Sequence, residues 1–201
     1  MNIQPITLTG THVRLEPLTN ANTAERITEL WDVANESAIW QYMPYGPIDS
    51  PARVAWLVEE LLRREQGGMD LPFVIMHQPS NRAIGMTRYM TIERANRGLE
   101  IGGTWLGKTY RRTPANTEAK YLMLAHAFDN LGAIRVQMRT DLRNERSQRA
   151  IERLGLVHEG VFRKHIIMPD GYQRSSVFYS VIDDEWPVLK LRLQNLLNGN
   201  Q

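Results

Sequence analysis

The chain has 201 residues, of which 42% are hydrophobic and 23% charged, and this size and mixture fit one globular domain. Lysine and arginine total 24 against 22 acidic residues, and a formal charge of +2 is too balanced for a protein that coats nucleic acid. The chain has no cysteine, which excludes disulfides, iron–sulfur clusters, thiolate zinc sites and a cysteine nucleophile.

Targeting and metal-binding patterns are the next features to consider. The N-terminal residues lack the basic and apolar regions of a signal peptide, and no apolar run approaches the ~20 residues that span a membrane. The five histidines are scattered, and none has the i, i+4 spacing of a helical metal pair. We therefore expect a cytoplasmic protein with no membrane partner and no bound metal.

The first half of the chain predicts one strand, two helices and a three-stranded meander. Asp49 or Ser50 can cap the second helix, Pro51 fits its first position, and Gly67 follows its end. Short polar connections separate the last three strands and make them antiparallel. The expected elements are a strand at 12–18, helices at 24–33 and 51–65, and strands at 71–77, 83–92 and 98–106.

In the second half the apolar period changes to that of a helix after residue 113, and Gly132 marks the end of this helix. Asp183 is the expected cap of the final helix. The remaining elements are a strand at 134–140, a helix at 144–154, a hairpin of strands 157–167 and 172–182, and a helix at 184–197. This order predicts an α/β fold with a mixed, mostly antiparallel central sheet and helices on both faces.

An aromatic loop interrupted by proline and glycine lies at residues 40–47. The pattern favours a loop folded onto the core. The alternative is a wall of a substrate cleft.

A strand, a short basic loop and a helix follow one another after residue 98. Thr113 can cap this helix and Pro114 fits its first position. Such a helix start presents unpaired N–H groups to an anion, and Arg111 and Arg112 add charge suited to phosphate. The pattern alone is typical of many helices.

The order of elements and several short segments resemble the GCN5-related N-acetyltransferase (GNAT) family, in particular its branch that acetylates ribosomal-protein N-termini and related substrates. The resemblance extends over most of the chain, from residues 8–18 to 183–186. It rests most specifically on residues 100–102, 116–120, 144–147 and 152–160.

The resemblance implies the acyltransferase fold of this family in a single domain at residues 1–201, with its core at about 10–187. It implies acetyl-CoA as cosubstrate, and as acceptor a primary amine of a protein N-terminus or a small molecule. The acetyl group would pass directly to the amine, with no covalent enzyme intermediate. We expect no nucleic-acid partner, and a homodimer stays open.

The family holds the pyrophosphate of acetyl-CoA with a loop of pattern Gln/Arg-x-x-Gly-x-Gly/Ala. Here Arg111 matches the first position, while Pro114 and Asn116 replace two small residues. Proline removes one donor, and the Asn116 amide can supply another. By resemblance, the cofactor-binding residues are Trp105, Leu106, Arg111, Arg112, Thr113, Ala115, Asn116, Thr117 and Asn144.

Gly102 and Gly103 suit a β-bulge beside the pantetheine arm, by family precedent. A backbone N–H near Trp105 or Leu106 would then face the thioester carbonyl.

Three residues are candidates for proton transfer. Glu100 is the first candidate for the proton acceptor, and its alternative is an ion pair with an arginine such as Arg88. Glu159 is the second candidate for the acceptor. Ser147 matches a position that can supply a general acid, but Asn144 and Ser147 also fit simple helix capping.

A binding module is the competing function. In this interpretation the fold has lost catalysis because of Pro114 and binds an acyl-CoA or RNA. Four arginines gather along one side of a helix and the residues before it: Arg143, Arg146, Arg149 and Arg153. A solvated face is the default interpretation, and the alternatives are contact with coenzyme A phosphates, an acidic acceptor or RNA.

Overall fold

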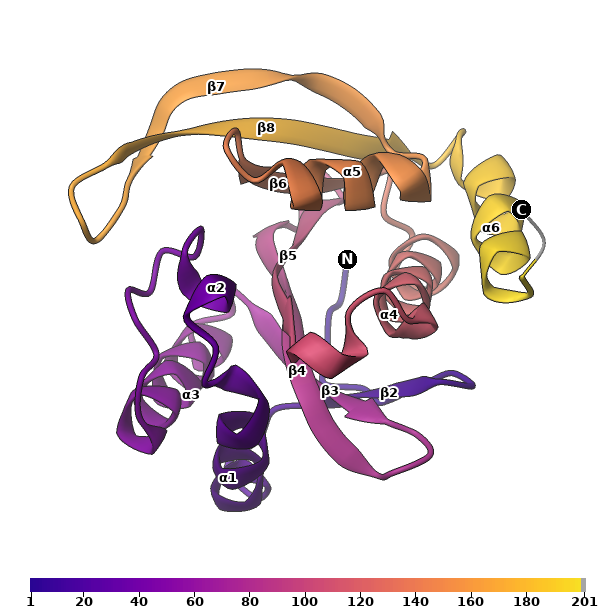
Figure 1. The fold of residues 1–201 in the computed structure, drawn as a ribbon. Helices are drawn as coiled ribbons and strands as arrows, with labels where there is room; N and C mark the ends of the chain where they lie inside the picture. The colour runs from indigo at the N-terminus through magenta and orange to yellow at the C-terminus, as the bar shows by residue number, and fades with distance from the viewer. Residues whose placement is uncertain (200–201) are drawn as a thin grey trace.

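The computed structural model describes residues 1–199, and an eight-stranded mixed sheet forms its centre (Figure 1). The strand order is β1-β2-β3-β4-β5-β6-β8-β7. All neighbours are antiparallel except β5 and β6, which are parallel. The strands are β1 (Leu8–Thr9), β2 (Val13–Pro17), β3 (Leu71–His77), β4 (Arg82–Glu93), β5 (Gly98–Leu106), β6 (Arg135–Asp141), β7 (Val157–Ile167) and β8 (Gln173–Ile182).

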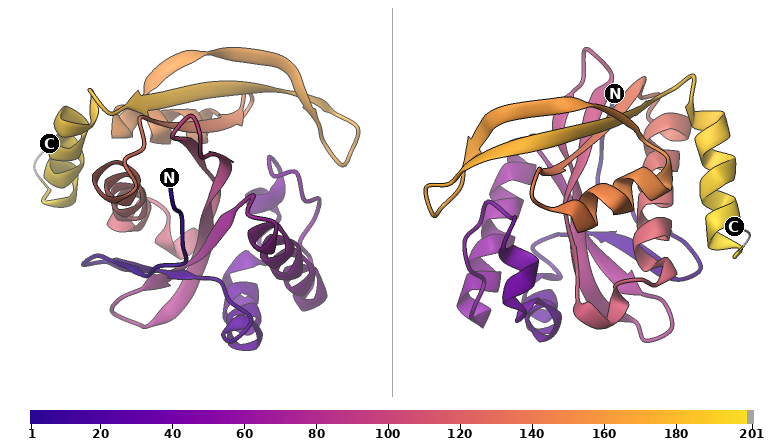
Figure 2. Two further views of the ribbon diagram at one scale, coloured as in Figure 1. Left: turned by 180° about the vertical axis from the view of Figure 1, so that it is seen from behind. Right: turned by 45° about the horizontal axis from the view of Figure 1, so that its top comes forward.

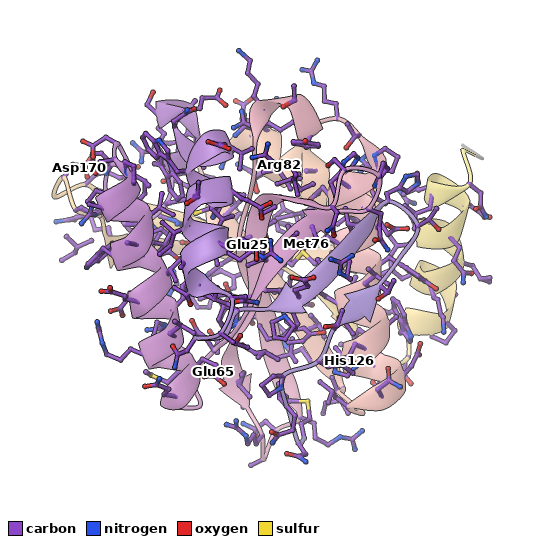
Figure 3. The ribbon with its side chains drawn as sticks, turned by 90° about the horizontal axis from the view of Figure 1, so that it is seen from below. Glu25, Glu65, Met76, Arg82, His126 and Asp170 are labelled. Carbon is purple, nitrogen blue, oxygen red and sulfur yellow. The ribbon has the colours of Figure 1, made fainter. Side chains whose placement is uncertain are left out.

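Helices cover both faces of the sheet, as the views from the front and from behind show (Figures 1 and 2). On one side, α1 and α3 enclose an apolar cluster that includes the fully buried Met76 (labelled in Figure 3). On the other side, α4, α5 and α6 pack on a second cluster around Tyr89 and Tyr179. The helices are α1 (Thr23–Ala34), α2 (Ser37–Trp40), α3 (Pro51–Gln66), α4 (Pro114–Ala125), α5 (Glu145–Leu154) and α6 (Trp186–Leu197).

Local sequence signals set three of the helix starts. Ser50 caps α3 by accepting a hydrogen bond from Arg53 N at 3.3 Å. Thr113 caps α4 with Pro114 at the first helical turn, and Asn144 caps α5. The predicted caps at these starts are confirmed, and so is the mixed, mostly antiparallel sheet with helices on both faces.

The predicted start of the last helix is wrong. Helix α6 begins at Trp186 with Glu185 at its cap position, and not at residue 184 under an Asp183 cap. The Asp183 N–H instead donates to Ile134 O at 3.1 Å, so this residue still belongs to the sheet edge. Pro187 fits only the first turn of a helix, and this explains the later start.

Four further elements were not predicted: the short strand β1, helix α2 in the segment before the aromatic loop, the 3₁₀ turn Lys108–Tyr110 and the π-helical turn His126–Asn130. The helix that follows Thr113 therefore changes its hydrogen-bond period before Gly132. No helix within residues 1–199 is both long and apolar enough to cross a membrane.

The parallel strands β5 and β6 are paired over only three positions. Gly98, Leu99 and Glu100 face Arg135, Val136 and Gln137, and the ladder ends there. Beyond this point the two strands separate, and the edges of residues 101–106 and 138–141 that face each other have no strand partner (Figure 1). This separation, called the split below, positions the candidate site.

Candidate active site

A β-bulge lies in β5 at the split. The pairs Met86–Trp105 and Arg88–Gly102 flank it, so two residues of β5 stand opposite one residue of β4. Gly103 has φ +58°, a left-handed conformation that glycine adopts without a steric penalty. The bulge predicted from Gly102 and Gly103 is confirmed, and it bends β5 at the place where β6 leaves it.

A buried lysine supports the bulge from the α4 side. Lys120 Nζ donates to the hydroxyl of Thr104 in the bulge and to that of Thr87 on β4, the latter at 3.3 Å. Burial lowers the pKa of Lys120 to about 7, because neither hydroxyl supplies the negative charge that would stabilise an ammonium. Sequence reasoning missed this residue, since a lysine at helical spacing is normally exposed.

The start of α4 has the groups of an anion site. Thr113 accepts from Ala115 N at 3.3 Å, while the N–H groups of Thr113 and Asn116 have no acceptor within the helix. Pro114 takes the position whose N–H would be unpaired in any case. Exposed Arg112 has φ +61° and forms no ion pair with residues 1–199.

The guanidinium of Arg111 is held by contacts within the protein. Its Nη2 lies 2.9 Å from Glu36 Oε2 and its Nε donates to Leu106 O at 3.1 Å. These contacts tie the end of β5 to the segment between α1 and α2. Of the two arginines predicted to meet phosphate, only Arg112 therefore has a free guanidinium.

Helices α4 and α5 are joined next to the split. Thr117 Oγ1 accepts from Arg153 Nη2 at 2.6 Å. Asn144 Oδ1 accepts from Ser147 N at 3.1 Å, which confirms the capping role of Asn144. The predicted cofactor residues Thr117 and Asn144 thus lie on facing helices.

Trp105 and Leu106 point to opposite sides of the sheet. The Trp105 ring packs 5.2 Å from the Trp40 ring in the cluster under α1 and α3, and Leu106 lies in the cluster under α4. Both side chains are packed in the core, so at the split β5 can contact a ligand through its backbone groups.

The start of the aromatic loop is packed in the core, whereas a later part of it lies beside the β-bulge. Trp40 is buried, as the core interpretation expects. A Cβ on Gly103 would lie 3.5 Å from the Tyr45 hydroxyl, which places that hydroxyl beside the bulge. Burial raises the pKa of Tyr45, and its hydroxyl therefore stays protonated near neutral pH.

A pocket of about 290 Å³ opens between α2 and the start of α5. Arg143 is central to it, with its guanidinium carbon 3.5 Å from the Tyr172 ring centroid and 5.7 Å from that of Tyr42. The pocket is lined by Ala38, Gln41, Tyr42, Arg143, Asn144, Glu145 and Arg146. The aromatic loop and the start of α5 therefore meet here, and the hairpin turn adjoins them (Figure 1).

Glu100 is buried at the closed end of the split. Its Oε1 lies 2.9 Å from Arg139 Nε, and its Oε2 accepts longer hydrogen bonds from Gln137 at 3.3 Å and Thr91 at 3.4 Å. The expected arginine partner, Arg88, is 3.2 Å from Asp70 instead. Glu100 is thus paired with an arginine, but with one from β6.

Glu159 lies on β7, and its carboxylate reaches across β8 to Arg135 in the part of β6 that is paired with β5. Both of its oxygens contact Arg135, at 2.5 and 2.6 Å, and Ser180 donates to Oε1 at 2.8 Å. The Arg135 guanidinium holds the pKa of Glu159 below its usual range. The structure does not bring Glu159 together with the pocket residues.

Glu118 is a buried carboxylate to which the sequence analysis assigns no role. It accepts hydrogen bonds from three successive backbone N–H groups, those of Thr11, His12 and Val13, at 2.6 to 2.8 Å. A Cβ on Gly10 would overlap the carboxyl group of Glu118, so only glycine fits there. Glu118 fixes α4 to the first strands.

No cluster of three or more histidine, aspartate or glutamate side chains within residues 1–199 is arranged to hold a metal ion.

Known proteins resemble this chain over most of its length. The family model for the acetyltransferase (GNAT) domain matches residues 12–157. A Bacillus subtilis (strain 168) protein named "Putative ribosomal N-acetyltransferase YdaF" is 25% identical over 165 residues, which cover 81% of this chain and 87% of that protein.

Two solved structures extend the comparison. A GCN5-related N-acetyltransferase from Brucella melitensis is 30% identical, has a TM-score of 0.89, and aligns over 97% of this chain and 86% of its own. A T. thermophilus structure named "putative acetyltransferase" is 38% identical with a TM-score of 0.84, over 98% of this chain and 100% of the other. The chain therefore belongs to the GCN5-related N-acetyltransferase family and is an N-acetyltransferase.

Proposed function

We propose that the protein transfers an acetyl group from acetyl-CoA directly to a primary amine held in the pocket between α2 and α5. The observation that carries this proposal is the split, where unpaired backbone of β5 lies between the start of α4 and the pocket. Backbone groups without a strand partner can hydrogen-bond an extended ligand as a neighbouring strand would.

The residues present fit acetyl-CoA, the cosubstrate of this family. The N–H groups of Thr113 and Asn116, the Asn116 amide and Arg112 would hold the pyrophosphate. Ala115 and Thr117 belong to the same first turns of α4. The backbone at Trp105 and Leu106, together with Asn144, would hold the pantetheine arm.

Glu100 is the proposed proton acceptor. In the reaction the amine nitrogen forms a bond to the acetyl carbon, the carbon–sulfur bond breaks, and the amine loses a proton. Glu100 Oε2, with its two long hydrogen bonds, is the freer oxygen of this carboxylate to take the proton, directly or through water. Glu159 is the weaker candidate, because its lowered pKa and its two contacts with Arg135 oppose protonation.

Ser147 is the proposed donor of a proton to the departing thiolate. It lies in the first turn of α5, beside the pocket residue Asn144. Replacing Ser147 with alanine leaves the backbone bond from residue 147 to Asn144 Oδ1 intact, so the capping role and the acid role separate in this variant.

The acceptor class follows from the named relative. YdaF carries the name "Putative ribosomal N-acetyltransferase", so N-terminal peptides of ribosomal proteins are the first acceptors to test. Small-molecule amines form the second group.

The experiment combines binding and turnover. Isothermal titration with acetyl-CoA is expected to give saturable heat, and a chromogenic thiol reagent is expected to detect CoA release with at least one group of amines. The chain contributes no background because it has no cysteine. Absence of both heat and thermal stabilisation at millimolar acetyl-CoA would overturn the proposal.

A binding module without catalysis would bind acetyl-CoA but release no thiol with any amine. RNA binding by the four arginines on and before α5 has little support, because three of them have partners within the protein. Arg143 pairs with Asp141, Arg149 with Glu145, and Arg153 contacts Thr117.

A further inference from the structure

The sheet face opposite α5 carries a cluster of charged side chains. Arg139 and Asp141 of β6 stand directly opposite Phe178 and Ser176 of β8, so their side chains share this face. Arg174 precedes Ser176 by two residues and lies on the same face. The cluster borders the pocket, because Arg174 Nη1 donates to the carbonyl of the pocket residue Tyr42 at 3.2 Å.

Positive charge exceeds negative charge in this cluster. Arg139 lies 2.9 Å from Glu100, and Arg143 lies 2.9 Å from Asp141. The third guanidinium, that of Arg174, forms no ion pair with any residue of the described part of the chain, 1–199. Each carboxylate of the cluster already has its own arginine, so Arg174 is in surplus.

Arg174 is nevertheless almost completely buried, with 6% of its surface exposed. Its Nε is buried without a hydrogen-bond acceptor, and the bond to Tyr42 O leaves most of its five N–H donors unused. A buried guanidinium without a counter-charge is less stable than one in water, and a bound anion would remove much of that penalty.

Two neighbouring side chains, those of His165 and Ser176, also have a buried polar atom without a hydrogen-bond partner. His165 Nε2 lies 3.4 Å from Arg139 Nη1, a donor, and this places the ring proton on Nδ1. That Nδ1 is buried without an acceptor, and so is the hydroxyl oxygen of Ser176. Burial and the nearby Arg139 and Arg174 lower the pKa of His165, which keeps the ring neutral.

Arg174, His165 and Ser176 can therefore all donate a further hydrogen bond, and the positive charge of Arg174 has no carboxylate partner. We propose that Arg174, His165 and Ser176 bind a carboxylate of the acceptor, so that the amine substrate carries a carboxylate close to its amino group. A guanidinium with two neutral donors suits the two oxygens of such a group. This inference rests on the proposed function, since it specifies the acceptor that uses the pocket.

Two sources of this carboxylate are tested side by side. A free amino acid supplies it as the α-carboxylate, and a peptide supplies it as an acidic N-terminal side chain. The probes are N-acetylglycine against N-acetylglycinamide, and N-acetyl-Asp-Ala-amide against N-acetyl-Asn-Ala-amide. Titration of these reaction products requires no turnover, so failure of the proposed function does not hide the result.

The variant is Arg174→Met, and the matched control is Arg149→Met, which removes an exposed arginine from a surface pair with Glu145. In the wild type and the control, at least one carboxylate probe is expected to bind roughly tenfold or more tightly than its amide partner. In Arg174→Met this preference is expected to disappear, while acetyl-CoA affinity is unchanged. The probe pair that shows the preference tells whether the carboxylate belongs to a free amino acid or to an acidic N-terminal side chain.

Stability separates this role from a structural one. Removal of an unpaired buried charge is expected to leave the melting temperature unchanged or higher, whereas removal of a structural arginine would lower it. The proposal is overturned if the two members of each probe pair bind equally, including no binding by either. It is also overturned if Arg174→Met keeps the preference for a carboxylate.

Discussion

The two faces of the sheet hold their buried ionisable side chains in different ways. On the α4 face, neutral groups hold each of these side chains: threonine hydroxyls hold Lys120, and backbone N–H groups hold Glu118. On the opposite face, Glu100 is paired with Arg139, and Arg174 has no carboxylate. The ionisable side chains held by neutral groups fix the position of α4, whereas a cluster with a surplus cation can exchange its contacts with a ligand.

The largest expected effect is on the α4 face. Glu118→Gln should lower the free energy of unfolding by about 3 kcal/mol, because an amide nitrogen would face at least one backbone N–H that now donates to a carboxylate oxygen. Urea denaturation measures this. Glu59→Gln, at an exposed position of α3, is the control and should change stability by less than about 0.5 kcal/mol. Equal effects in the two variants would contradict the anchoring role of Glu118.

On the opposite face, Glu100→Gln should lower kcat about 100-fold and change the shape of the pH–rate profile, because the variant cannot accept the amine proton. Glu159→Gln is the comparison and should keep turnover near wild type, since Glu159 pairs with Arg135 away from the pocket. Steady-state thiol release as a function of pH measures both. A wild-type profile in Glu100→Gln would remove Glu100 from this role.

Lys120 gives the α4 face a pH dependence. Between pH 7 and pH 9 the folded protein binds fewer protons at Lys120 than the unfolded chain, because burial lowers the pKa from 10.5 to about 7. The free energy of unfolding should therefore rise with pH, by about 2 kcal/mol over this range. Lys120→Met should lose this contribution when urea denaturation is repeated across the range. An unchanged slope would show that Lys120 is charged in the fold.

The smallest expected effect separates the two arginines before α4. Arg112→Ala should weaken acetyl-CoA binding roughly threefold to tenfold, about 1 kcal/mol, with a smaller effect in high salt because the side chain is exposed. Arg111→Ala should instead lower the melting temperature, since it releases Glu36 and Leu106 O. Calorimetric titration and thermal denaturation measure the two effects, and the reverse assignment would contradict this division.

Strands and caps could be predicted from the sequence because their signals are local. The strands at 71–77 and 98–106 agree with β3 and β5 to the residue, since short runs rich in apolar residues and bounded by turn residues define them. The bulge could also be predicted, because two adjacent glycines weaken a strand at one point. The start of α6 could not, since it depends on the continuation of the sheet edge at Asp183.

The candidate site was only partly predictable, because much of it depends on contacts between distant residues. Nothing next to Arg111 in the sequence distinguishes it from Arg112, since its partner Glu36 is 75 residues away. The three N–H groups that bind Glu118 lie more than 100 residues from it. The sequence also does not show that Arg174 lacks a carboxylate partner, because this depends on the pairing of Glu100 with Arg139 and of Asp141 with Arg143 in the folded chain.

Through Glu118, the N-terminal segment helps to fix the position of α4, the helix whose start is proposed to bind the cofactor. Removal of residues up to Val13 would leave a negative charge buried beside α4 without its three donors. Rotation of α4 to hydrate that charge would also move the helix start at Thr113. A protein shortened through Val13 can thus lose acetyl-CoA affinity although every residue around the split is intact.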